Sequence, residues 1–418
     1  MIYMRTSPLR CLAACARAQQ GTARRMLSSN ARLDISPSGW LGPRGNFAPS
    51  GSNDPFLGYP TCEETLFTSP PGLINLDTGA PCQALLKRAQ EAMVTGFVHW
   101  NSRGLASTMQ YGPTVGTKHF RTQLANFLTA AYGNDVSSKC LFQTAGATHG
   151  FALALSTWFG RTNLERRTCF IEDPTYFLAP AILKDHGFNM DPIPVRASDG
   201  IDLARLETRV LAAKAEGRLA RPDEAHFAGV VYCIPSYHNP TGSTMNESNR
   251  RRLVDFARAH NLLVVADDVY ELLHYASSPK PPPRLVSYDL DGKGSGNVLG
   301  NGTFSKIMSP GVRCGWVEAH PSLINRLSNA GTISSSGAPA QLMGSILAST
   351  IETGEAANVL HDTREMLAER MAAVSAVFAA RAPAGCSLSV PSGGMCAWLS
   401  LPEHVDVHAV LVAARRRG

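Results

Sequence analysis

The stretch AGVVYCIPSYHNPTGSTMNESNRRRLVDFARAHNLLVVADDVY, residues 228–270, decides the fold class. Its two apolar runs, 228–234 and 262–266, are short and rich in β-branched residues, which is typical of parallel strands buried on both faces. Between them, Asn246 can cap a helix with Glu247 in its first turn. A strand, a helix and a second strand in series predict an α/β crossover.

The surrounding sequence repeats this pattern. A similar apolar run spans 168–171, and Leu141 and Phe142 lead into a turn. Several crossovers in series predict an α/β domain with a mostly parallel sheet, and the Ala-rich stretch 340–382 indicates helices of a smaller lobe. Ligands of such sheets bind beyond the carboxyl ends of the strands, so the residues directly after each strand are the informative ones.

Composition excludes several classes of protein. The chain has 418 residues, 44% hydrophobic and 17% charged, which is an ordinary globular mixture. No apolar run approaches the ~20 residues that a membrane helix needs. Outside residues 1–33 the basic and acidic residues balance, which argues against a nucleic-acid-binding surface. The ten cysteines have no zinc-site spacing, and we expect an intracellular protein without disulfides or a structural metal.

Residues 1–33 hold all of the excess positive charge. They contain no acidic residue, and their arginines are Arg5, Arg10, Arg17, Arg24, Arg25 and Arg32. This composition is that of a mitochondrial presequence, and we expect a mitochondrial protein. A tail without structure, or upstream sequence wrongly read as coding, would have the same composition and would leave a cytoplasmic protein.

Small residues follow the run near 141–143, in the segment Thr144-Ala145-Gly146-Ala147-Thr148. At the start of a helix such residues leave backbone N–H groups free to bind an anion. A plain connection is the alternative. After 168–171, Tyr176 follows Pro174 and could stack on a flat ligand, or could pack on its own loop.

The two strands of the opening stretch are each followed by polar residues. Asn239, in Pro235–Gly242, would point its amide into the same crevice, although Asn-Pro-Thr-Gly is also a good turn in its own right. His238 beside it is interpreted as scaffold. Asp267 ends the next strand, where a buried carboxylate is costly unless it meets a positive charge.

A lysine stands in a third such segment, Thr303-Phe304-Ser305-Lys306, seven residues before Arg313. A lysine between small hydroxyl residues in an apolar stretch suits a desolvated amine that forms a Schiff base. Any single lysine is more often a solvated surface residue, so the interpretation depends on the whole set of segments.

Together these segments resemble the class I/II aminotransferase family, whose fold-type I members use pyridoxal 5′-phosphate (PLP). The resemblance runs from Asp77 to Glu403, with the N-x-x-Asn-Pro-x-Gly, Asp-x-x-Tyr and Ser-x-Lys–Arg motifs in family order. The segments Gln110–Pro113 and Ser305–Ile307 are most similar to the group around 2-aminoadipate, kynurenine and valine aminotransferases.

The resemblance implies a role for each matching residue. Lys306 would hold PLP as a Schiff base and move the substrate's proton, Asp267 would keep the ring nitrogen protonated, and Tyr176 would stack on the ring. Asn239 and Tyr270 would hydrogen-bond the ring's 3′ oxygen. The phosphate would be held by Gly146, Ala147, Thr148, Ser305 and Arg313, and Thr303, which stands where the family often has Ser, would also bind the cofactor. Tyr111 would reach the phosphate of a neighbouring subunit, which implies a homodimer.

The implied function is PLP-dependent transamination between an L-amino acid and a 2-oxo acid, in amino acid metabolism and biosynthesis, with no nucleic acid or membrane partner. The implied architecture is α/β, with a large PLP domain and a smaller α+β lobe built from both ends of the chain. The expected divisions are a presequence at 1–33, an arm and part of the small domain at 34–105, the large domain at 106–325, and the small domain at 326–418.

The family pattern breaks near the end of the sequence. Residues 391–398 match the family's Gly-Gly strand, but nothing between Leu401 and Gly418 matches the later Arg-Leu-x-Phe segment whose arginine binds the substrate carboxylate. We therefore expect a truncated or mispredicted sequence of an active enzyme. Two alternatives stay open: another fold-type I enzyme, such as a C–S β-lyase or synthase, and a catalytically impaired pseudoenzyme. A regulator with a winged-helix domain is disfavoured, because residues 1–75 are too short and too rich in Gly and Pro.

Overall fold

The structure is a computed structural model that describes residues 2–5, 79–197 and 199–417. The chain divides into two compact units. The larger unit comprises Gly79–Ala380 and Ser389–Trp398, and the smaller comprises the described parts of Met1–Thr78, Arg381–Leu388 and Leu399–Gly418. Within the described residues no helix combines the length and the apolar character that crossing a membrane requires.

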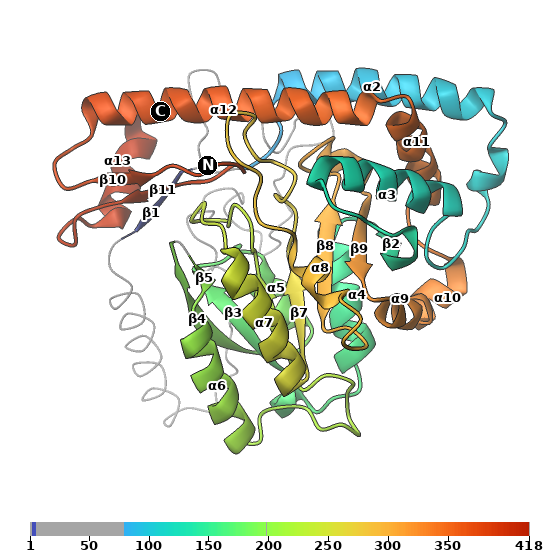
Figure 1. The fold of residues 1–418 in the computed structure, drawn as a ribbon. Helices are drawn as coiled ribbons and strands as arrows, with labels where there is room; N and C mark the ends of the chain where they lie inside the picture. The colour runs from blue at the N-terminus through green and yellow to red at the C-terminus, as the bar shows by residue number, and fades with distance from the viewer. Residues whose placement is uncertain (1, 6–78, 198, 418) are drawn as a thin grey trace, which may run out of the picture. The chain divides into compact units, whose positions relative to one another are not determined.

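An eight-stranded sheet forms the centre of the larger unit (Figure 1), with the order β2-β9-β8-β7-β6-β3-β4-β5. The strands are β2 (Leu141–Thr144), β3 (Thr168–Asp173), β4 (Asn189–Arg196), β5 (Gly200–Ile201), β6 (Gly229–Cys233), β7 (Leu262–Ala266), β8 (Val298–Thr303) and β9 (Gly315–Ala319). The neighbours from β8 through β4 pair in parallel, whereas β9 pairs antiparallel with β2 and β8, and β5 pairs antiparallel with β4. The sheet is therefore mostly parallel.

Both faces of the sheet are buried, as the unbroken apolar runs predict. Along β6 and β7, side chains alternate between two hydrophobic clusters: Val230 and Val265 belong to one, and Val231 and Val264 to the other. This is the period of two that a β-strand imposes.

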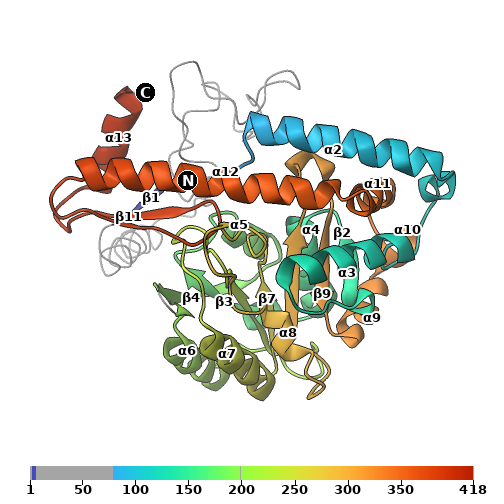
Figure 2. The same cartoon turned by 45° about the horizontal axis from the view of Figure 1, so that its top comes forward.

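Helices cover each face of the sheet. The helices of the larger unit are α2 (Gln83–Ser102), α3 (Lys118–Tyr132), α4 (Ala147–Phe159), α5 (Ala179–Asp185), α6 (Leu203–Ala215), α7 (Glu247–His260), α8 (Leu285–Asp289), α9 (Pro321–Ser328), α10 (Gly331–Ser336), α11 (Gln341–Glu352) and α12 (Glu355–Arg381). Leu206 of α6, Leu253 of α7 and Leu285 of α8 pack on one face, where α6 and α7 lie side by side (Figure 2). Phe151 of α4 packs on the other face.

The long helix α12 runs beside α2 (Figure 2). Arg88 of α2 joins them, because its guanidinium lies 2.7 Å from Glu355 and 3.0 Å from Asp362. In the smaller unit, β1 (Ile2–Arg5), β10 (Ser387–Ser389) and β11 (Ala397–Ser400) form a sheet of order β1-β11-β10, and α13 spans Val407–Arg417.

The structure confirms the crossover that the sequence predicts. The strands are β6 and β7, α7 begins at Glu247, and the side chain of Asn246 accepts a hydrogen bond from the backbone N–H of Asn249. The run at Leu141 and Phe142 forms β2, which pairs antiparallel with β9 at the edge of the mostly parallel sheet that the sequence predicts. A short apolar run does not encode the direction of its neighbour, so its sequence could not distinguish the two pairings.

Some expectations fall outside the described residues. The arm predicted in 34–105 is described only from Gly79, and the predicted presequence only at Ile2–Arg5, which form β1. The division of the chain into domains stays a prediction.

Candidate active site

Four loops meet at the edge of the sheet where the parallel strands end. They follow β3, β6, β7 and β8, and they carry Tyr176, Asn239, Asp267 and Lys306. Because adjacent parallel strands end at the same edge, residues far apart in the sequence come together there. The sequence predicted these four residues as one set.

Lys306 lies three residues after β8 with its amine in the interior. The Nζ atom donates a hydrogen bond to the backbone carbonyl of Gly79 at 2.6 Å. Burial lowers the pKa of the Lys306 amine, while the nearby Cys396 thiol and Asp267 carboxylate raise it. A lysine with a lowered pKa has a larger neutral fraction, and the neutral amine is the form that acts as a nucleophile or base.

Asp267 is the first residue after β7 and is buried. Its Oδ2 accepts a hydrogen bond of 2.5 Å from the hydroxyl of Tyr232, and its Oδ1 is buried with no hydrogen-bond partner among the described residues. Burial raises the pKa of Asp267 to about 6, against the hydrogen bond from Tyr232 and the charge of Lys306, which lower it. Oδ1 can therefore accept a hydrogen bond from a positively charged donor.

Asn239 and Tyr270 lie in contact with each other in the loops that follow β6 and β7. The Asn239 side-chain amide donates to the Tyr270 hydroxyl at 3.2 Å, and its Oδ1 is buried with no partner in the part of the chain that the structure describes. Arg250 of α7 holds the preceding turn, because its guanidinium donates to the backbone carbonyl of Pro235 at 3.1 Å and to the hydroxyl of Ser236. A buried arginine thus anchors the turn that leads to Asn239.

An anion cradle forms at the start of α4. Gly146 caps the helix at φ 98°, a conformation that favours glycine, and no side chain caps the first turn. A Cβ on Gly146 would lie 3.0 Å from the Arg313 guanidinium. Arg313 donates to the carbonyl of Ala145 at 3.1 Å, which places the guanidinium beside the helix start. Free N–H groups and an arginine suit a phosphate.

The other predicted cradle residues lie in the same two segments. Ala147 and Thr148 form the first turn of α4, and Thr148 is exposed. The hydroxyls of Thr303 and Ser305 lie 2.9 Å apart after β8.

The two predicted tyrosines outside these segments differ in position. Tyr176 is half-buried and lies close enough to Tyr232 to raise the pKa of that phenol. Tyr111 is 81% exposed. The structure therefore brings Tyr176 to the Asp267 side of the site and leaves Tyr111 on the surface.

Sequence reasoning missed Tyr232, Gly79 and Cys396. Tyr232 is a tyrosine inside the buried strand β6, and a buried phenol normally needs a hydrogen-bond partner, which was a usable signal. Nothing in the sequence marks the carbonyl of Gly79 or the thiol of Cys396 as neighbours of Lys306. Glu172, the next-to-last residue of β3, accepts from the backbone N–H of Ile234 at 2.7 Å and lies 3.1 Å from His238, the histidine interpreted as scaffold.

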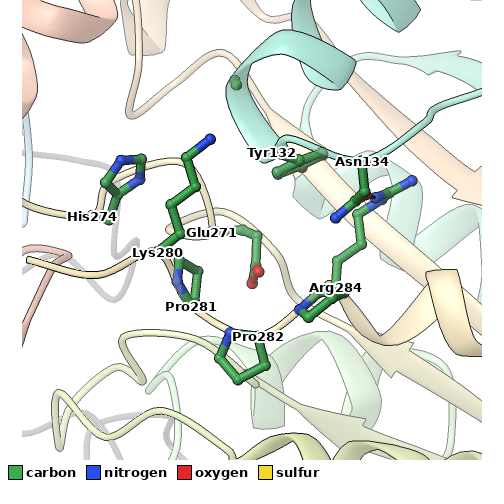
Figure 3. Close-up of a pocket in the computed structure, with 10 residues that line it drawn as sticks. Tyr132, Asn134, Glu271, His274, Lys280, Pro281, Pro282 and Arg284 are labelled. Atoms are coloured by element: carbon green, nitrogen blue, oxygen red, sulfur yellow. Dashed lines mark hydrogen bonds between the residues drawn. The ribbon is translucent and has the colours of Figure 1, made fainter.

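A hollow elsewhere in the larger unit contains none of these residues (Figure 3). Glu271, His274, Lys280 and Arg284 line it together with Tyr132, and its open space of about 10 Å³ is room for about one water molecule. The guanidinium of Arg284 donates to the carboxylate of Glu318 at 2.5 and 2.6 Å, and it lies over the ring of Tyr132. This hollow is too small to hold a metabolite.

Asp268, next to Asp267, generates a pH-dependent prediction. Its Oδ1 is buried without a hydrogen-bond partner among the described residues, and burial and Glu271 raise its pKa well above the ordinary value. An aspartate with a raised folded-state pKa destabilises the protein as the pH rises above its unfolded pKa, near 4. Asp268→Asn stays neutral, so its melting temperature should equal the wild-type value near pH 4 and exceed it by a few degrees at pH 7–8.

Differential scanning calorimetry across that range measures the effect. Asp255→Asn is the matched control, because the Asp255 side chain is 75% exposed. An exposed ion pair contributes little to stability, so losing the pair with Arg258 should leave the pH dependence of the melting temperature unchanged. A wild type that is more stable than Asp268→Asn at pH 7–8 would contradict the prediction.

Comparisons with known proteins show the family to which this chain belongs. The family described as Aminotransferase class I and II matches residues 71–415. The uncharacterized protein YER152C of Saccharomyces cerevisiae is 30% identical over 364 residues, covering 79% of this chain and 82% of that protein. Aromatic-amino-acid aminotransferase 1 of Thermococcus litoralis is 28% identical over 314 residues, covering 75% of this chain and 70% of the relative.

A solved structure shares the fold. Kynurenine aminotransferase of Pyrococcus horikoshii, crystallised with PMP and with KYN and KYA as substrates and products, has a TM-score of 0.68 and 26% identity. The match covers 82% of this chain and 79% of the kynurenine aminotransferase. This chain belongs to the class I and II aminotransferase family and is a PLP-dependent aminotransferase that acts on amino acids and 2-oxo acids.

Proposed function

We propose that Lys306 is the amine that holds PLP and moves the substrate's proton in this aminotransferase, and that Asp267 faces the ring nitrogen. The observation that carries the proposal is the pairing of a buried amine with a buried carboxylate at the ends of adjacent strands. Each alters the pKa of the other, so the two charges act across one site.

The residues present fit the cofactor. Asp267 and Asn239 each keep a buried oxygen that lacks a hydrogen-bond partner within the described chain, as acceptors for a ring N–H and a hydroxyl would. The start of α4 and Arg313 offer donors for a phosphate. When bound, PLP supplies an aldehyde carbon that reacts with amines and a ring that withdraws electrons.

Each side chain of the site would then have a separate role. Lys306 Nζ takes the proton from the substrate's α-carbon and returns it, because burial lowers its pKa toward the range of a general base. Asp267 Oδ1 would accept a hydrogen bond from the ring N–H and keep it protonated. Tyr176 would stack on the ring, and Asn239 and Tyr270 would hydrogen-bond its 3′ oxygen. Gly146, Ala147, Thr148, Ser305 and Arg313 would hold the phosphate, and Thr303 would also bind the cofactor.

A lysine substitution tests the proposal. Wild-type protein reconstituted with PLP should show a visible absorption band that changes when an amino acid is added. Lys306→Ala should lack this band, and its kcat should fall at least 10²- to 10⁴-fold, roughly the loss expected for a proton-transfer group. The amino acid panel begins with tyrosine, phenylalanine, kynurenine and 2-aminoadipate, with 2-oxoglutarate as acceptor.

Lys280→Ala is the matched control, since Lys280 lies in the separate hollow, and it should behave as wild type. A Lys306→Ala variant with the wild-type spectrum and rate contradicts the proposal. Release of ammonia and pyruvate, instead of exchange of amino groups, would identify a β-lyase.

We also propose that the chain forms a homodimer through one exposed apolar surface. Val94, Phe97 and Val98 lie on one side of α2 and are 57%, 49% and 61% exposed, and Met109 and Tyr111 follow at 69% and 81%. Exposed apolar side chains that gather on one side of a helix are typical of an interface. A second copy would bury it, and the proposed role of Tyr111 at the neighbour's phosphate requires the same contact.

The double substitution Val94→Glu/Val98→Glu should convert the dimer to a monomer, because it places two charges in the buried interface. Light scattering after size-exclusion chromatography measures the mass. Val377→Glu is the control, since Val377 is equally exposed, at 59%, but lies on α12. A monomeric wild type, or a double variant with the wild-type mass, would refute the dimer.

We propose a mitochondrial location and a role in amino acid biosynthesis. The composition of residues 1–33, with arginines and no acids, supports the location. The family's chemistry, which makes and consumes amino acids, supports the role.

A further inference from the structure

Tyr232 is a buried residue that touches Asp267 and has no place in the chemistry described so far. It lies in β6, paired with Val265 of β7, and is 1% exposed. Its ring packs on Phe151 of α4, with the ring centroids 5.0 Å apart. Strand pairing and ring packing together fix the position of its hydroxyl.

The hydroxyl determines how the Asp267 carboxylate is oriented. It donates to Oδ2 at 2.5 Å, and the backbone N–H of Asp267 donates to the carbonyl of Cys233 at 2.8 Å. The side chain and the backbone are both held, so only Oδ1 is left for another donor. We propose that Tyr232 is a positioning residue that orients Asp267 so that Oδ1 faces the ring nitrogen of PLP. This inference rests on the proposed role of Asp267.

The hydrogen bond also affects the charge of Asp267. The charged and titratable groups that act on it are Glu172 from β3, Tyr232 from β6, Lys306 after β8 and Asp268 beside it. Burial raises the pKa of Asp267 to about 6, and the Tyr232 hydrogen bond is the largest influence that lowers it. Without Tyr232, the pKa of the Asp267 carboxyl group would rise further, and its charged form, which stabilises a protonated ring nitrogen, would be less populated.

Tyr232 can perform this role only as a donor. Burial and the neighbouring carboxylate raise the pKa of its phenol well above the ordinary value of 10, so the proton stays on the tyrosine. The alternative is that Tyr232 only fills space and that its hydroxyl is satisfied incidentally. The two roles differ in their effect on the titration of Asp267.

The test is Tyr232→Phe, measured first in the protein without PLP. The infrared band of a protonated carboxyl group is followed from pH 5 to 9, and Asp267→Asn identifies the contribution of Asp267. In wild type this contribution should titrate near pH 6, and in Tyr232→Phe its midpoint should move to higher pH. An unchanged midpoint overturns the inference.

The second readout uses the holoenzyme at pH 7.5. In Tyr232→Phe, kcat should fall about 10- to 100-fold, the factor expected for a hydrogen bond to a charged group, while KM changes little. The acid limb of the pH–kcat profile of Tyr232→Phe should shift to higher pH. Tyr288→Phe is the control, because it also removes a buried tyrosine hydroxyl, but one that lies on α8 and makes no hydrogen bond to Asp267. A Tyr232→Phe variant with wild-type kcat and pH profile refutes the inference.

A different result would disprove the proposed role of Asp267 itself. If Asp267→Asn is as active as wild type, the assignment of Asp267 is wrong, and the inference about Tyr232 falls with it. If Asp267→Asn is inactive and Tyr232→Phe is normal in both readouts, only the inference about Tyr232 is wrong.

Discussion

The structure depends on placing ionisable groups in its interior at the ends of parallel strands. A buried carboxylate such as Asp267 is costly in free energy unless a donor or an opposite charge compensates it. Here Tyr232 satisfies one oxygen, and Lys306, after the next strand, supplies a positive charge. The remaining oxygen has no hydrogen-bond partner among the described residues. Under the proposed role of Asp267, this oxygen accepts a hydrogen bond from the protonated ring of PLP.

The rest of the larger unit keeps these groups in place. Buried arginines hold the loops that follow the strands: Arg250 anchors the turn before Asn239, and Arg284 is fixed by Glu318. Arg313 lies beside the glycine at the start of α4, and its guanidinium donates to the carbonyl of Ala145. Since each loop is attached to a strand buried on both faces, the side chains are held by the core and not by the loops alone. A rigid scaffold that positions functional loops is the usual arrangement of such sheets.

Much of this could be predicted from the sequence. The strands at 229–233 and 262–266 and the helix capped by Asn246 follow from local periodicity and capping, which are encoded in neighbouring residues. The choice of the residues after each strand as site candidates followed from the rule that ligands bind beyond the carboxyl ends of parallel strands. The antiparallel β2, the hydrogen bond from Tyr232 to Asp267 and the contact of Lys306 with Gly79 could not be predicted. They join residues far apart in the chain, and no local pattern records which distant partner a side chain meets.

The identity of the reactive amine can be measured directly. The protein is incubated with PLP, treated with borohydride to make the bond between the amine and the cofactor permanent, digested and analysed by peptide mass spectrometry. The account predicts that the added mass is found at position 306 and that adding an amino acid before the borohydride removes it. Label on another lysine, or label that an amino acid does not displace, would contradict the account.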